Sequence, residues 1–102
     1  MLELRPTCEN CSRPLPPASL DARICSFECT FCAECVASVL NDVCPNCGGG
    51  FVPRPVRPAR EWRSGVFLGT RPAGERVVHH PVDRTAHAEL SARLAAIPPH
   101  ER

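Results

Sequence analysis

Large apolar residues are sparse in the first half of the chain and form no long run. Between residues 8 and 47 they are Leu15, Leu20, Ile24, Phe27, Phe31, Val36, Val39, Leu40 and Val43. A segment of about 50 residues lies near the lower limit at which burial alone sustains a fold. We therefore expect this half of the chain to need bound metal or disulfide bonds in addition to its small core.

The last apolar pattern of the chain has the spacing of an α-helix. Its members are Ala86, Leu90, Leu94 and Ile97. Asp83 or Thr85 can cap the start of such a helix and the prolines after residue 97 stop it, which predicts a helix over residues 84–97. Because the apolar stripe is thin, the helix either docks on another surface or frays.

Glycine and proline residues divide the chain into three parts. These are a module over residues 1–52, an extended linker over residues 53–64 and a poorly ordered tail over residues 65–102. Three glycines form a turn at the end of the module, and residues 51 and 52 predict a short closing strand. Prolines alternate with arginines in the linker, which favours polyproline II conformation. In the tail, a brief apolar run at residues 65–69 predicts a strand or a docking patch.

All the cysteines lie in the module, in four close pairs. They are Cys8, Cys11, Cys25, Cys29, Cys32, Cys35, Cys44 and Cys47. Eight thiols so arranged fit two tetrahedral four-thiolate zinc sites, with the pairs combined either sequentially or in an interleaved way. A site closed by four thiolates has no position for water, so we expect a structural role, no catalysis and no small-molecule substrate.

Other uses of the cysteines remain as alternatives. Residues 1–6 have no basic start and no apolar run, so no secretory signal is expected, which favours the reducing cytoplasm over disulfides. An iron–sulfur electron carrier is weighed because Cys29, Cys32 and Cys35 are spaced as in ferredoxins, although the next cysteine comes later than in that pattern. Oxidation of metal-bound thiolates could also act as a redox switch. No apolar stretch is long enough to span a membrane.

Charge is distributed unevenly between the two halves. Residues 1–50 carry three arginines against six acids, a net charge of −3, whereas residues 51–102 carry nine arginines against five acids, a net charge of +4. Each zinc held by four thiolates adds a further −2, so the metal-loaded first half is expected to be strongly acidic. The partner is therefore expected to be another protein, with nucleic acid as the alternative.

The nucleic-acid alternative depends on an arginine repeat. Arg54, Arg57, Arg60 and Arg63 recur at every third residue. Polyproline II has three residues per turn, so the four side chains would project from one edge about 9 Å apart and could bind phosphates, with Trp62 stacking on a base. The interpretation that we favour is a solvated linker or a strap across the acidic module of the same chain.

Three of the four histidines in the tail, His79, His80 and His87, do not predict a further metal site. His79, Asp83 and His87 are spaced four apart, as one helix face would require, but Pro81 interrupts that segment. We expect solvated histidines instead.

The cysteine pattern resembles that of RING-type zinc fingers. Cys44-Pro45-Asn46-Cys47 matches the C-P-x-C ending, Phe31 precedes the fifth ligand, and Cys29 stands where histidine is commonest. The resemblance implies a small metal-stabilised α+β fold of the RING-like or treble-clef type, with a cross-brace, short hairpins and a short helix at residues 36–40. It assigns one zinc to Cys8, Cys11, Cys32 and Cys35, and the other to Cys25, Cys29, Cys44 and Cys47. It also implies a core of Ile24, Phe27, Phe31, Val39 and Leu40.

RING-type ubiquitin ligases carry an apolar residue after the first ligand and a cationic residue near the last. Glu9 and Gly48 stand at those positions, so binding of a ubiquitin-conjugating enzyme is not expected.

The module as a whole is similar to a family of short bacterial cysteine-rich proteins, the domain of unknown function 1272. The similarity lies in residues 1–6, in residues 22–32 and in residues 44–49, and it covers about residues 1–57. It implies a bacterial zinc-type module and brings no activity or partner. We therefore expect a non-enzymatic zinc-binding interaction module.

Overall fold

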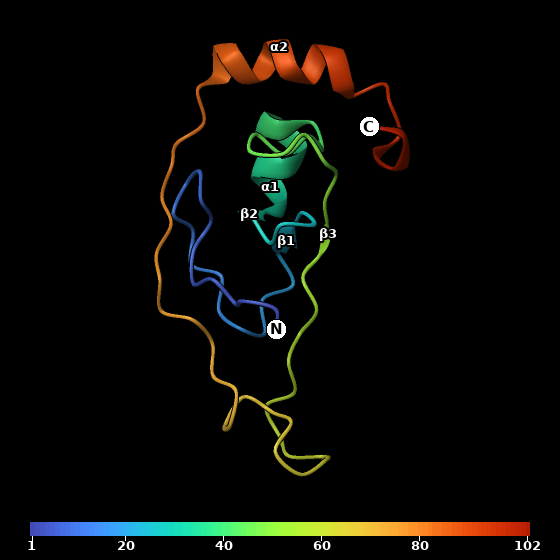
Figure 1. Cartoon of the computed structure of the whole chain (residues 1–102). Coiled ribbons are helices and arrows are strands. Elements are labelled where there is room, and N and C mark those ends of the chain that lie inside the picture. Colours follow the sequence, from blue (N-terminus) through green and yellow to red (C-terminus); the bar gives the residue numbers. More distant parts are fainter.

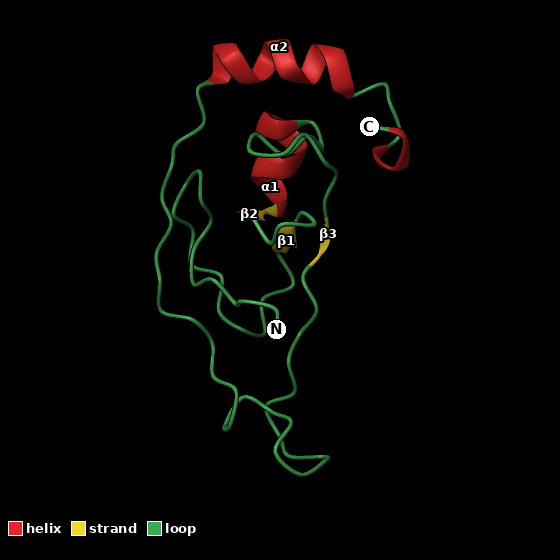
Figure 2. Cartoon of the chain, in the orientation of Figure 1, coloured by secondary structure: helices red, strands yellow, loops and turns green.

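A small antiparallel sheet and one short helix form the centre of the fold in the computed structural model, which describes residues 1–102. In chain order the elements are β1 (Ala22–Ile24), β2 (Thr30–Cys32), α1 (Ala33–Cys35), η1 (Val36–Leu40), β3 (Val52–Pro53), α2 (Arg84–Leu94) and η2 (Pro99–Glu101). The strands are hydrogen-bonded in the order β2-β1-β3, and loops make up most of the remaining chain (Figure 1, Figure 2). The fold is thus a small one with short strands and few helices.

β1 and β2 form a hairpin whose turn carries two of the cysteines. The register places Ala22 opposite Cys32, and the turn spans residues 25–29. Glu28 adopts a φ of 65°, and its N–H donates to the carbonyl of Cys25 at 3.0 Å. These two features reverse the chain within a few residues and bring the turn cysteines close to the end of the sheet.

A short closing strand was expected at residues 51 and 52; the structure has it one residue later, as β3, which pairs with the other side of β1. Val52 lies opposite Ile24 in an antiparallel register. Phe51, immediately before β3, packs edge-on against Phe31 of β2, with ring centroids 5.5 Å apart. The N–H of Arg54 then donates to the carbonyl of Ala22 at 2.9 Å, which fixes the linker against the module.

α1 and η1 form one continuous helical segment directly after β2. Cys32 caps it, because its Sγ accepts a hydrogen bond from the N–H of Cys35 at 3.4 Å. The segment ends where Asn41 and Asp42 adopt φ values of 51° and 58°, a left-handed conformation in which these two residue types are enriched. The helix expected at residues 36–40 is therefore present, and it begins earlier, at Ala33.

Apolar side chains and buried cysteines share one core. Phe31, Leu15 and Leu40 are each at most 1% exposed and belong to it. The expectation for Phe27 is wrong, because this residue lies in the β1–β2 turn and is 73% exposed. Leu4, which the sequence did not single out, is buried instead.

α2 is shorter than expected and lies across the helical segment that ends at Leu40 (Figure 1). Asp83 caps it, because its carboxylate accepts hydrogen bonds from the N–H groups of Thr85 and Ala86, both at 3.1 Å. The helix ends at Leu94 rather than at residue 97, because the N–H of Ile97 turns back to the carbonyl of Leu94 at 2.9 Å.

The buried face of α2 is polar, which differs from the apolar stripe expected there. His87 and Ser91 are each 4% exposed, whereas Ala86 is exposed. His87 Nε2 donates to the carbonyl of Leu40 at 2.9 Å, and Asn41 Nδ2 donates to Ser91 Oγ at 3.1 Å. The expectation that His87 is solvated is therefore wrong, because its ring packs against the end of η1 and shares the carbonyl of Leu40 with the N–H of Val43, which donates to it at 3.0 Å.

The tail is also more engaged with the module than a poorly ordered segment would be. It contacts the module from Gly74 onward and ends at Arg102, whose guanidinium donates to the carbonyls of Asp42 and Gly48 at 2.9 Å and 3.1 Å. Residues 65–69 form turns rather than a strand. Figure 1 shows the tail running back beside the amino-terminal segment before it reaches α2.

Gly48 tests whether α2 is docked as described. It has a φ of 78°, and a Cβ added there would lie 3.0 Å from Leu94 Cδ1. We expect Gly48→Ala to lower the free energy of unfolding by about 1–2 kcal/mol, through backbone strain and displacement of Leu94. Gly65 is the matched control, because its φ is 77° and nothing lies near its added Cβ. Equal losses for the two variants in urea unfolding would contradict the docking of Leu94.

Candidate metal centre

Four cysteines from two distant segments meet in a first cluster. The Sγ atoms of Cys8, Cys11, Cys32 and Cys35 all lie within 4.8 Å of one another. Cys8 and Cys11 come from a tight amino-terminal turn, which is closed by a hydrogen bond from the N–H of Ser12 to the carbonyl of Cys8 at 3.0 Å. Cys32 ends β2 and Cys35 ends α1. The sulfurs thus come from the first and third cysteine pairs of the chain.

A second cluster joins the hairpin turn to the loop before β3. The Sγ atoms of Cys25, Cys44 and Cys47 lie within 4.8 Å of one another. The loop that carries Cys44 is closed by two hydrogen bonds of 2.8 Å, from the N–H of Gly48 to the carbonyl of Cys44 and from the N–H of Cys44 to the carbonyl of Gly49. The structure therefore brings together three of the four sulfurs expected here.

Cys29, the fourth expected member, lies beside the second cluster but outside that limit. It is 9% exposed, and its carbonyl accepts a hydrogen bond from the N–H of Cys25 at 3.2 Å. Its Sγ accepts a hydrogen bond from Asn46 Nδ2 at 3.4 Å, and Asn46 belongs to the loop that supplies Cys44 and Cys47.

Two asparagines that the sequence analysis missed each hold one cysteine sulfur, one in the first cluster and one beside the second. Asn10 Nδ2 donates to Cys35 Sγ at 3.3 Å, as Asn46 donates to Cys29. Both asparagines occupy the same position in a short repeat, because residues 8–11 and residues 44–47 both read C-x-N-C. In the first cluster, Asn10 thus lies between the first two cysteines of the chain and donates to Cys35, which belongs to the third cysteine pair. This repeat is the sequence signal that could have found them.

Burial raises the pKa of several of these thiols, whereas at Cys11 the effect of burial is outweighed by hydrogen bonds from the Arg13 backbone and from neighbouring thiols, which lower the pKa. Burial raises the pKa of Cys35 and of Cys44 well above the usual range of a thiol, and it raises the pKa of Cys32 as well. Crowded thiols in a dry site resist ionisation, whereas a bound cation favours the thiolate, because it supplies the missing charge. The clusters are thus arranged to be stabilised by a cation.

A buried ion pair fastens the first cluster to the sheet. The carboxylate of Glu9 is buried, lies 2.7 Å from Arg5 Nη1 and accepts a hydrogen bond from the N–H of Thr30. The N–H of Glu9 also donates to the carbonyl of Thr30 at 3.0 Å. Glu9 therefore holds Cys8 beside β2. The position of Glu9 next to a cysteine in the sequence did not indicate this role.

The arginine repeat does not form one exposed edge. Arg54 is 4% exposed, and its guanidinium donates to the carbonyls of Arg5, Leu15 and Pro16 at 2.9–3.1 Å. Arg57 is half-buried and donates to the carbonyl of Leu2 at 2.8 Å.

Arg60 and Arg63, the other two members of the repeat, are exposed. The expectation that the four arginines share one exposed edge is therefore wrong, because the pairing of β3 with β1 directs Arg54 into the module. This arrangement fits the interpretation that the linker lies across the module of the same chain.

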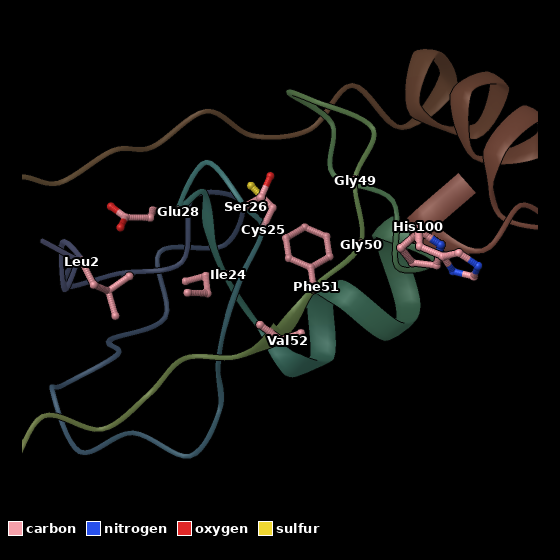
Figure 3. Close-up of a pocket in the computed structure, with 11 residues that line it drawn as sticks. Leu2, Ile24, Cys25, Ser26, Glu28, Gly49, Gly50, Phe51, Val52 and His100 are labelled. Atoms are coloured by element: carbon pink, nitrogen blue, oxygen red, sulfur yellow. The ribbon is translucent and has the colours of Figure 1, made fainter. Parts of the chain in front are cut away.

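A cavity of about 620 Å³ lies beside the second cluster (Figure 3). Ile24, Phe51 and Val52 form much of its wall, Cys25 borders it, and the tail residue His100 lies at one end. The tail thus contributes to the surroundings of the second cluster as well as of the first. No helix of the structure combines the length and the apolar character needed to cross a membrane.

Comparison with known proteins places the module in a family. No solved structure matches the chain. An uncharacterized protein of Rhizobium meliloti (strain 1021) is 66% identical over 59 residues, which is 58% of this chain and 70% of that protein. The family model described as "Protein of unknown function (DUF1272)" matches residues 1–57. Because that match covers more than half of the chain and includes all eight cysteines, this protein belongs to the DUF1272 family.

Proposed function

We propose that the protein is a non-enzymatic interaction module that binds two zinc ions and whose partner is another protein. The observation that carries this proposal is that the module already holds a polypeptide, its own tail, through contacts along its surface. The two cysteine clusters support the zinc assignment, because closely spaced cysteine thiolates are the ligands of structural zinc.

For the second zinc we propose Cys29 as the fourth ligand. The parallel between the two C-x-N-C segments supports this assignment, because Asn10 donates to a sulfur of the first cluster and Asn46 donates to Cys29. Zinc would then be held by interleaved pairs, as in the cross-brace that the RING-like resemblance implies. Such a brace links the two ends of the module and supplies the folding free energy that its small core lacks.

The way the tail is held supports a protein partner. Main-chain N–H groups of Gly74 and His80 donate to carbonyls of the module at 3.0 Å and 2.8 Å. Carbonyl oxygens of the module need donors from the partner. A polypeptide carries an N–H donor at almost every residue, whereas a nucleic-acid backbone presents mainly acceptors. With Arg54 and Arg57 engaged inside the protein, the nucleic-acid alternative rests on the exposed Arg60, Arg63 and Trp62.

Affinity purification of the tagged full-length protein from its native cells tests this function. We expect a partner protein that is enriched in stoichiometric amount, that survives nuclease treatment and that is lost when zinc is removed with a chelator. The control is Ser26→Ala, which changes an exposed residue next to Cys25 and leaves the sulfurs in place. If enrichment depends on nuclease-sensitive material and is lost on replacing Arg60 and Arg63, the protein-partner proposal is wrong.

A further inference from the structure

We propose that one edge of the module is a docking site for an extended peptide of the pattern small residue-x-Arg, and that the tail of this chain is its displaceable occupant. The docking edge comprises residues 3–10, and the strap that occupies it comprises residues 74–82. This inference rests on the proposed function, because it names the site and the chemistry of the partner.

The strap runs beside the docking edge in the same chain direction. The N–H of Gly74 donates to the carbonyl of Leu4 at 3.0 Å, and the N–H of His80 donates to the carbonyl of Glu9 at 2.8 Å. The N–H of Val82 then donates to the side-chain oxygen of Asn10 at 2.9 Å. An extended peptide can present main-chain N–H groups at the spacing of these acceptors. Proteins recognise peptides in this way when the peptide lies along an exposed edge as an additional strand.

Two positions of the strap carry chemical specificity. A Cβ added to Gly74 would lie 3.3 Å from the carbonyl oxygen of Leu4, so this position selects a small residue. Two residues later, Arg76 forms a bidentate pair with Glu3, with nitrogen–oxygen distances of 2.7 Å and 3.1 Å. A planar guanidinium matches a carboxylate in this geometry better than an ammonium does.

The carboxylate of Glu3 is prepared for that arginine by the module itself. Arg5 Nε donates to Glu3 Oε1 at 3.1 Å, and the N–H of Glu3 donates to Glu28 Oε2 at 3.2 Å. The pKa of Glu3 is lowered to about 2, chiefly by the hydrogen bond from Arg76 and further by Arg5, against the opposing effect of burial. Because most of this lowering comes from Arg76 itself, the module's own contribution is to hold Glu3 in position, through Arg5 and Glu28.

The strap is held loosely enough to be exchanged. Most of its side chains are exposed, including Val77 at 60%, and only Val78 and Val82 are half-buried. Little apolar surface is therefore buried, so the strap is held mainly by its main-chain hydrogen bonds and by the Arg76–Glu3 pair. The family match covers residues 1–57, so the docking edge lies within the matched region and the strap lies outside it.

Tethering explains why a weakly held strap still occupies the edge. A segment on a flexible linker has an effective concentration on the order of 1 mM. With an intrinsic Kd on the order of 10–100 µM, the tethered strap would fill the edge and weaken binding of an external peptide on the order of 10- to 100-fold. Weakening the strap in cis should therefore strengthen binding of a peptide in trans.

The test measures binding of a fluorescent synthetic peptide of residues 72–84 to the full-length, zinc-loaded protein by anisotropy. We expect Arg76→Glu in the protein to tighten binding of the wild-type peptide at least tenfold. Arg60→Glu is the matched control, because it makes the same change of charge at an exposed residue outside the strap, and it should bind as the unmodified protein does. Metal content measured on each variant shows that the module is intact.

Specificity is tested by exchanging the charges. In a protein that carries Glu3→Arg alone, Arg76 of the strap is repelled from the edge, so this protein should fail to bind the wild-type peptide and should bind a peptide that carries Arg76→Glu. Adding Arg76→Glu to that protein restores the pair in cis and should weaken binding of this peptide again. Equal binding of the peptide to the Arg76→Glu and Arg60→Glu proteins, or equal binding of a scrambled peptide, would overturn the proposal. A partner still enriched from cells after such a result would locate the interaction elsewhere and leave the proposed function standing.

Discussion

Replacing Cys32 by serine is expected to reduce the zinc content and to abolish cooperative unfolding of the module. Cys32 is fully buried, ends β2, caps α1 and belongs to the first cluster, so one substitution removes a proposed metal ligand, a helix cap and a core side chain. Structural zinc contributes about 10–16 kcal/mol of apparent binding free energy, which is comparable to or larger than the whole stability of a small domain. The free energy lost with one zinc ion is therefore larger than the stability that the remaining interactions of the module can provide.

Elemental analysis and thermal unfolding followed by circular dichroism measure this effect. The Cys32→Ser protein should contain at most one zinc ion and show a broad, non-cooperative transition, as the unmodified protein should after chelation. Ser26→Ala, next to the proposed ligand Cys25, is the control and should retain both ions. An unchanged melting transition in the Cys32→Ser protein would mean that metal does not hold the module together.

The second large effect is expected at Arg54. Its buried guanidinium satisfies three carbonyl groups, those of Arg5, Leu15 and Pro16, and the structure pairs it with no carboxylate. Burial lowers the pKa of Arg54, and the surrounding carbonyl dipoles compensate part of the cost of burying its charge. Removing it leaves the carbonyls of Arg5 and Leu15 without this donor, whereas that of Pro16 keeps the N–H of Ser19 at 2.8 Å. Arg54→Ala should therefore lower the free energy of unfolding by about 2–4 kcal/mol.

Two further variants separate hydrogen bonding from charge. Arg54→Lys keeps the charge but cannot reach three carbonyls with a planar fork, so it should recover only part of the loss. Arg60→Ala removes an exposed member of the same repeat and should change the free energy of unfolding by less than about 0.5 kcal/mol. If Arg54→Ala and Arg60→Ala unfold at the same urea concentration, Arg54 does not have this structural role.

Local patterns in the sequence predicted several elements of the module. The closing strand and the Asp83 cap depend on nearby residues, and the structure contains both. The helix over residues 36–40 was expected from the resemblance to RING-type zinc fingers, and it is also present. The cysteine spacing likewise indicated two clusters, because each C-x-x-C turn presents two sulfurs together whatever the rest of the chain does.

The contacts between distant segments could not be predicted in the same way. Arg54 was expected on an exposed edge, because a repeat of three suits polyproline II, and the pairing of β3 with β1 turned it inward. His87 was expected in solvent, because apolar residues were used to find the docking face of α2. That face instead makes polar contacts with the end of η1, where His87 donates to the carbonyl of Leu40 and Ser91 accepts from Asn41. These contacts become visible only once the two helices are placed together.

Native mass spectrometry of the full-length protein purified without added metal tests the central claim most directly. The account predicts the mass of one chain plus two zinc ions, less the protons that the ligand thiols release. A mass lowered by two hydrogens for each disulfide, a mass that corresponds to iron and sulfide, or an intact fold that carries no metal would each contradict it.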